Sequence, residues 1–83
     1  MRYVADINIR LKKGVRDPEG ATIQQALANL GFVVVDVSTA KKFYVTLDAS
    51  DEAEASELID KMCTVLLSNP IIHDYDYKIS PQE

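Results

Sequence analysis

Side chains that could carry out nucleophilic chemistry are scarce in this 83-residue sequence, which contains one histidine and one cysteine. His73 lies in an alternating run with Tyr75 and Tyr77, a pattern typical of a strand histidine that packs against tyrosines. Cys63 sits beside a helical apolar stripe, where a lone cysteine behaves as a small buried hydrophobic residue. Because nucleophilic catalysis needs a Ser, Thr or Cys next to a base, the residues predict no catalytic constellation.

Metal and phosphate sites are not predicted either. The carboxylates between Asp48 and Asp60 surround a helix start and have no Asx-Gly loop, so we interpret them as a solvated helix terminus and not as a calcium site. Gly14 and Gly20 fit neither a dinucleotide fingerprint nor a P-loop. A single cysteine allows neither an internal disulfide nor a thiolate-rich metal site. We therefore expect this chain to bind no metal and no cofactor of its own.

A short basic run is the remaining feature with chemical character. Lys12, Lys13 and Arg16 lie close together after the first predicted strand. Such a run is commonly just solvated, and it also has the composition of a docking patch for an acidic surface. On residue chemistry alone, the chain is predicted to be a binding or scaffolding module.

Composition limits the class of partner. The formal net charge is −4, which argues against nucleic acid because phosphate-backbone binders need clustered Lys and Arg. No apolar run has the length of a signal peptide or a membrane span, so we expect no membrane partner and a cytoplasmic location. With 47% hydrophobic and 27% charged residues, the chain is predicted to form a single globular domain over residues 1–79, with a polar tail at 80–83.

The clearest local signal is a helix over residues 18–30. Asp17 can cap its free N–H groups, and Pro18 suits the first helical position. Gly31 supplies the left-handed residue that ends a helix. The apolar stripe of this helix consists of Ile23, Ala26, Leu27 and Leu30.

The other predicted elements follow from apolar periodicity. A period of two favours strands over residues 3–11, 43–47 and 71–79, and a β-branched run favours a strand over 32–37. A second helix is expected from a Ser50 cap to Asn69-Pro70. The order strand-helix-strand-strand-helix-strand predicts an α+β, ferredoxin-like fold, with a four-stranded antiparallel sheet and two helices on one face.

Small size predicts a partner. A domain this short buries only somewhat more than about 60% of its unfolded surface, so its core is thin and one sheet face is left open. Apolar side chains on both sides of the predicted strand 32–37 indicate that a second copy covers that face. The candidate dimer interface consists of Val33, Val35, Val37, Phe43 and Val45.

Two stretches resemble a known family. The run Leu11-Lys12-Lys13-Gly14-Val15-Arg16-Asp17-Pro18-Glu19-Gly20, followed by Ile23, Ala26, Leu27 and Leu30-Gly31-Phe32, is similar to PurS, the small subunit of phosphoribosylformylglycinamidine synthase. The run Met62-Cys63, then Leu66-Leu67-Ser68-Asn69-Pro70-Ile71-Ile72 and Asp74-Tyr75, resembles the later part of the same family. Family members usually carry an Arg and a Gly where this chain has Ser38 and Ala40, and an acid is common where His73 stands.

The resemblance implies a function in purine biosynthesis. It implies a non-catalytic structural subunit of a three-part ligase, bridging a glutaminase subunit and a large synthetase subunit, in a complex that uses ATP, magnesium and glutamine. The loop after the first strand is then a candidate partner-docking surface. Its residues are Lys12, Lys13, Gly14, Val15, Asp17, Pro18 and Gly20.

Two alternative functions share the same plan of strands and helices. A free-standing regulatory domain of the ACT type would bind amino acids at a dimer interface near the first strand-helix turn, and Gly14 is compatible with it. An acylphosphatase-like enzyme would need an Arg and an Asn aimed at a phosphate. Arg16 and Asn29 lie near the first helix, but no cradle of glycines accompanies them.

Overall fold

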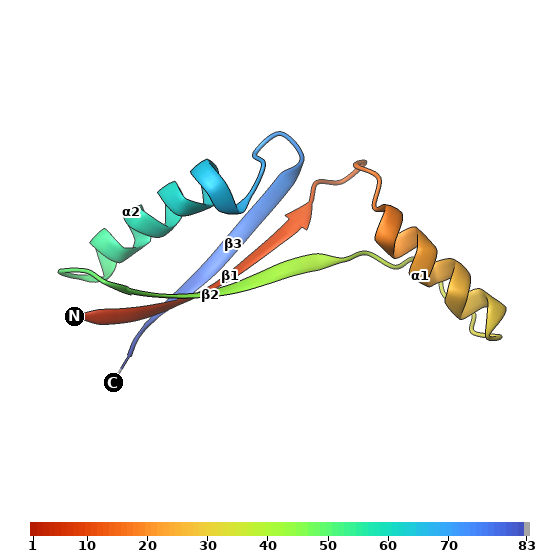
Figure 1. Cartoon of the computed structure of the whole chain (residues 1–83), viewed down its shortest axis with the longest axis horizontal. Helices are drawn as coiled ribbons and strands as arrows, with labels where there is room; N and C mark the ends of the chain where they lie inside the picture. Colours follow the sequence, from red (N-terminus) through yellow and green to blue (C-terminus); the bar gives the residue numbers. More distant parts are fainter. Residues whose placement is uncertain (83) are drawn as a thin grey trace.

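The computed structural model describes residues 1–82 and shows a three-stranded antiparallel sheet (Figure 1). The strands are β1 (Arg2–Leu11), β2 (Ala40–Asp48) and β3 (His73–Pro81), in the order β2-β1-β3. Ile7 pairs with Phe43 on one side and with Tyr77 on the other. The long first strand is therefore central, and both other strands are edges.

One face of the sheet is covered by α2 (Glu52–Met62), which continues into a π-turn, η1 (Cys63–Leu67). The N–H of Ser68 donates to the carbonyl of Cys63 and closes that turn at 2.9 Å. The helix cap is Asp51 and not Ser50 as the sequence predicts, since the Asp51 carboxylate accepts the N–H of Glu54. Ser50 instead bonds to the Glu54 carboxylate through its N–H and hydroxyl.

The core lies between β1 and α2. The buried side chains of its main cluster are Ala5, Ile7, Ile9, Ile59 and Cys63. A smaller cluster at the other end contains Tyr3, Ala49 and Ala55. Alternate residues of β1 supply three of the five side chains of the main cluster and one of the three in the smaller cluster, as the period of two predicts.

The opposite face of the sheet is polar. Lys42 pairs with Asp6 across β1 and β2 at 2.8 Å, and Arg10 pairs with Asp76 across β1 and β3. The pKa of Lys42 is raised, first of all by its hydrogen bond to Asp6. The expectation of an apolar open face is corrected, because most apolar members of the strands point to α2, with Val4 and Tyr44 among the exceptions.

The first helix stands apart from the rest of the molecule (Figure 1). Helix α1 (Pro18–Asn29) makes no extended contact with α2 or with any strand among the described residues. We call residues Asp17–Thr39 the arm. The arm consists of α1 and of residues 32–39, the return segment, which lead back to β2. The molecule measures 52 × 29 × 15 Å, and its radius of gyration is 16.5 Å, against about 12 Å for a compact chain of this length.

The α+β class and the antiparallel sheet are confirmed, and two details of the predicted plan are corrected. Residues 32–37 form no strand in the described chain, so the sheet has three strands in place of the four expected. Only α2 covers the sheet, because residues 32–39 continue away from β2 and carry α1 away from the sheet. The stripe residue Leu30 is consequently 74% exposed.

Strand β3 extends to Pro81, so it includes the first residues of the segment expected as a tail, and Glu83 lies outside the described residues. Within residues 1–82, no helix is both long enough and apolar enough to span a bilayer.

Candidate functional site

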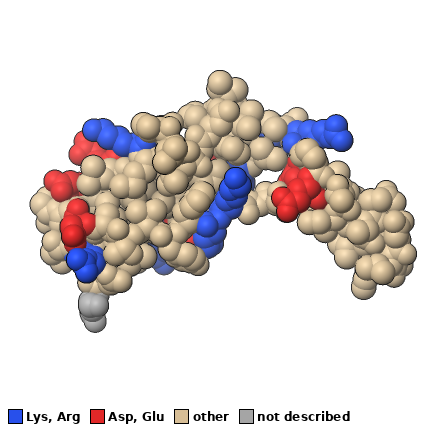
Figure 2. All heavy atoms as spheres, in the orientation of Figure 1, with Lys and Arg blue, Asp and Glu red and all other residues tan. Residues whose placement is uncertain are grey.

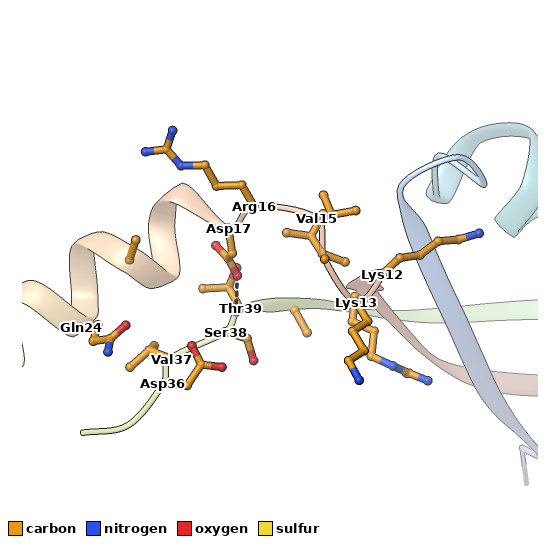
Figure 3. A pocket seen from close by; sticks show the side chains of 15 residues that line it. Lys12, Lys13, Val15, Arg16, Asp17, Gln24, Asp36, Val37, Ser38 and Thr39 are labelled. Atoms are coloured by element: carbon orange, nitrogen blue, oxygen red, sulfur yellow. Dashed lines mark hydrogen bonds between the residues drawn. The ribbon is translucent and has the colours of Figure 1, made fainter. Parts of the chain in front are cut away.

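The loop between β1 and α1 lies against residues 36–40, and together they form a cleft of about 540 Å³ at the base of the arm (Figure 3). Every residue of the loop from Lys12 to Asp17 lines this cleft. Gly14 has φ +88°, and the N–H of Val15 donates to the carbonyl of Lys12 at 3.1 Å. The glycine thus makes the turn that directs the chain away from the sheet.

Asp17 holds the two chain segments of this cleft together. Its carboxylate caps α1 by accepting the N–H of Gly20 at 2.8 Å, as the sequence predicts. The same carboxylate accepts the N–H of Thr39 at 2.6 Å and the Thr39 hydroxyl at 2.8 Å. These hydrogen bonds, first the one from Gly20 and then those from Thr39, lower the pKa of Asp17.

Gly20 permits the close approach of α1 to the returning chain. A Cβ atom at this position would lie far inside van der Waals contact of the Val37 carbonyl oxygen and would also crowd the Asp17 carboxyl carbon. Gly20 is the buried residue of α1. The glycine is therefore required by packing and not by a positive φ.

The basic run does not form one patch. The side chains of Lys12, Lys13 and Arg16 point in three different directions in Figure 3, with Lys12 toward β3 and Arg16 toward the α1 side. Lys12 also extends the pairing of β1, since its N–H donates to the carbonyl of Ile72 at 2.8 Å. A single flat acidic surface would meet at most part of this run.

The candidate interface residues fall into three groups. Val33 and Val35 lie in the arm and are 100% and 95% exposed. Val37 is half-buried in the cleft beside Asp17. Phe43 and Val45 face α2 and pack against the core, although Val45 also lines a groove beside α2.

The polar groups that the sequence singles out have structural roles. His73 Nδ1 accepts the N–H of Asn69 at 2.8 Å and so fixes the turn before β3. Cys63 is fully buried, as predicted, and burial raises the pKa of its thiol. Tyr75 and Tyr77 stack with ring centroids 6.4 Å apart, and the Tyr77 hydroxyl meets that of Ser56 at 2.7 Å. Residues 1–82 contain no group of His, Cys, Asp or Glu arranged to hold a metal ion.

Sequence reasoning missed three contributors to the arm and its surroundings. Thr39 is the partner of Asp17, and the Gln24 amide donates to the Val35 carbonyl at 3.2 Å. Val65 and Leu66 lie in η1, are each more than 80% exposed and line a groove together with Val45. The sequence does contain a signal for Val65 and Leu66, because two adjacent apolar side chains cannot both be buried on a single helical stripe.

Comparison with known proteins identifies the family. Residues 4–81 match the family model described as PurS: Phosphoribosylformylglycinamidine (FGAM) synthase. The chain belongs to the PurS family. This finding confirms the resemblance drawn from residues 11–32 and 62–75, and it decides against the ACT-type alternative.

PurS subunits from other organisms match this chain over nearly their whole length. The chain is 46% identical over 84 residues to the phosphoribosylformylglycinamidine synthase subunit PurS of Methanothermobacter thermautotrophicus, covering 100% of this chain and 99% of that protein. It is similar to the solved PurS of Methanocaldococcus jannaschii, with a TM-score of 0.85, 45% identity and coverage of 98% and 99%. A chain in the structure of PurLQS from Thermotoga maritima matches with a TM-score of 0.86, 27% identity and coverage of 96% and 99%.

Proposed function

We propose that this chain is the non-catalytic structural subunit of phosphoribosylformylglycinamidine synthase, an enzyme of purine biosynthesis, and that it bridges the glutaminase and synthetase subunits. The observation that carries the proposal is the PurS match over residues 4–81. A PurS-like chain in a structure named PurLQS supports an assembly with further subunits. Purine biosynthesis of this kind is consistent with a cytoplasmic location.

The shape of the chain suits a bridging subunit. Its longest extent is 52 Å and its shortest is 15 Å, so it exposes much more surface than a compact chain of its length. The reactive side chains, Cys63 and His73, are occupied by core packing and by a backbone hydrogen bond. The chain therefore contributes by positioning other subunits and not by reacting itself. It holds two larger subunits at a fixed geometry, so that ammonia released from glutamine reaches the synthetase site without escaping into water.

In this proposal the reacting groups belong to the complex. ATP, magnesium and glutamine are used by the partner subunits in the conversion of formylglycinamide ribonucleotide to formylglycinamidine ribonucleotide. The chain itself acts as a homo-oligomer. Its candidate interface with a second copy consists of Val33, Val35, Val37, Phe43 and Val45.

The Lys12–Gly20 loop is the proposed docking surface for one partner subunit. It lies at the junction of sheet and arm, and Lys13 and Arg16 project from it into solvent (Figure 3). Pro18 and the Asp17 hydrogen bonds restrict its conformation, which lowers the entropy lost on docking. The remaining residues of the proposed surface are Lys12, Gly14, Val15 and Gly20.

Reconstitution tests this function. The chain is mixed with the glutaminase and synthetase subunits, and synthesis is measured with glutamine and, separately, with free ammonia. We expect the chain to co-elute with both subunits and to be required for the glutamine-dependent reaction, while the ammonia-dependent reaction proceeds without it. Equal glutamine-dependent rates with and without the chain would overturn the proposal.

A further inference from the structure

The turn between η1 and β3 is built around Asn69. The Asn69 carbonyl accepts the N–H groups of Ile72 and His73 at 3.0 and 2.8 Å. Its side-chain Oδ1 accepts the N–H of Ile71 at 3.1 Å, and Pro70 has no N–H to donate. The N–H of Asn69 itself donates to His73 Nδ1 at 2.8 Å. Asn69 and His73 are therefore joined by a reciprocal pair of hydrogen bonds, and one of the two uses a ring nitrogen.

Only a neutral imidazole can make this second bond. A ring nitrogen accepts a hydrogen bond when it carries no proton, so the bond from Asn69 assigns the proton of neutral His73 to Nε2. In the protonated form both ring nitrogens are donors. A proton on Nδ1 would therefore face the Asn69 N–H, donor against donor. Histidine is the side chain whose ordinary charge change falls between about pH 8 and about pH 5.

The surroundings of His73 offer a positive charge little stabilisation. Residues 62–73 include no Lys, Arg, Asp or Glu, and the turn lies within uncharged surface at the top of the molecule in Figure 2. The charged side chains that line a cleft with His73 come from β1, α1 and β2, and they are Arg10, Glu19 and Lys41. Lys12 extends toward β3 (Figure 3), Asp74 points to the other face of the sheet, and Asp60 of α2 accepts the Tyr75 hydroxyl. In the cleft, two cations thus stand against one carboxylate.

The same turn holds the start of the Lys12–Gly20 loop. The N–H of Lys12 donates to the carbonyl of Ile72 at 2.8 Å, and Leu11 pairs with His73 across β1 and β3. This pairing ends where the chain turns at Gly14 and leaves the sheet. Opening of the turn would therefore release the residue at which the loop begins.

We propose that His73 makes this turn pH-sensitive, so that protonation of Nδ1 opens the reciprocal pair with Asn69 and loosens the start of the Lys12–Gly20 loop. The step is one proton taken from solvent onto Nδ1, and no covalent bond of the chain breaks. His73 is half-buried, so the protonated ring can turn into solvent. The turn is closed where histidine is neutral and opens as the pH falls through the range in which histidine gains its proton. This proposal rests on the proposed function only for its consequence, which is weaker docking in acid.

Nuclear magnetic resonance of the isotope-labelled full chain tests the turn directly, and His73 is the one histidine of the sequence. At about pH 8 we expect Nδ1 to show the chemical shift of an unprotonated ring nitrogen and a coupling across the hydrogen bond to the Asn69 amide nitrogen. At about pH 5 both signatures should disappear. The amide protons of Lys12 and Asn69 should then lose at least about fivefold of their protection from solvent exchange, which is the factor for one ordinary hydrogen bond.

Two substitutions separate the proton from the hydrogen bond. His73→Asn offers a side-chain oxygen in place of Nδ1, and that oxygen accepts at any pH, so protection of the Lys12 amide should stay high in acid. His73→Phe keeps an aromatic ring but has no acceptor, so protection should be low at both pH values. A protonated Nδ1 in the wild type at about pH 8, or a wild-type turn that stays closed at about pH 5, overturns the proposal. An equal acid effect in His73→Asn overturns it as well.

Docking is measured separately, as the concentration of chain that half-restores glutamine-dependent synthesis. Comparison of the wild type with His73→Asn at each pH cancels the effects of pH on the partner subunits. We expect the wild type to need more chain than His73→Asn in acid and the same amount at about pH 8. Equal requirements at both pH values would overturn the link from the turn to the loop. If neither chain supports synthesis, the proposed function fails, while the resonance measurements still judge the turn.

Discussion

The carboxylate of Asp17 accepts both the N–H and the hydroxyl of Thr39, at 2.6 and 2.8 Å, and thereby joins the start of α1 to the chain that enters β2. The two residues are 22 positions apart in sequence. These hydrogen bonds set the direction of the arm, because α1 makes no extended contact with the sheet. Substitutions around them should affect the arm before they affect the core.

Gly20→Ala should destabilise the arm, although alanine ordinarily favours a helix over glycine by about 1 kcal/mol. The added methyl group would collide with the Val37 carbonyl, which is backbone and cannot rotate away. We expect loss of helical circular dichroism at lower temperature than for the wild type and weaker self-association.

Thr22→Ala is the matched control for this substitution, since Thr22 is an exposed residue of the same helix whose hydroxyl bonds only to the Pro18 carbonyl. It should leave both the helical signal and self-association close to those of the wild type. A more stable helix in the Gly20→Ala variant would show that the approach to Val37 does not constrain the arm.

Asp17 should make the stability of the arm depend on pH. Its pKa is lowered in the folded chain from the ordinary value of 3.8, so its contribution is fully present above that value and is lost as the pH falls through the lower folded pKa. Asp17→Ala should therefore melt earlier than the wild type at neutral pH and alike in strong acid, as followed by circular dichroism. A difference that persists undiminished in acid would contradict the assignment.

Charge reversals in the loop should act unequally. Lys12 and Lys13 point in different directions, so one partner surface can bury only one of them deeply. Measured as the concentration of chain that half-restores glutamine-dependent synthesis, Lys12→Glu and Lys13→Glu should differ by about tenfold or more, as interface and rim charges do. Lys78→Glu, at an exposed position of β3 opposite Asp6, is the control and should have no effect on docking at the loop. Wild-type behaviour of both loop variants would remove the loop from the interface.

The core should depend on Ile59. This side chain is fully buried between α2 and β1, so Ile59→Ala is expected to lower the free energy of unfolding by about 2–5 kcal/mol. Ile71→Ala, at a residue 83% exposed, should change it by less than about 0.5 kcal/mol. Urea titrations of the two variants give both values.

Local signals made much of this fold predictable from sequence. The Asp17 cap, Pro18 and Gly31 define α1 within a residue of its observed end, and Gly31 has the expected positive φ of 94°. Alternation in β1 correctly separates the core side from the polar side. Each of these features depends on residues that are close together in the sequence, so the sequence pattern is enough to predict it.

The placement of the arm could not be read in the same way. The valines at 33 and 35 have a strand's preference, but a strand forms only where another edge is available, and the pattern does not say on which chain. The partnership of Asp17 with Thr39 is equally non-local. A histidine beside tyrosines suggested packing, whereas His73 acts through its ring nitrogen on the Asn69 backbone.

The single thiol of the chain, Cys63, can report on local opening of the core between α2 and the sheet. It lies beneath the junction of α2 and η1 with no exposed surface, and burial raises its pKa, so a thiol reagent can modify it only when the helix lifts from the sheet. The rate of labelling under native conditions would therefore time that opening directly. Because the sheet and α2 form one unit and the arm another, the labelling rate of Cys63 would not depend on local unfolding of the arm.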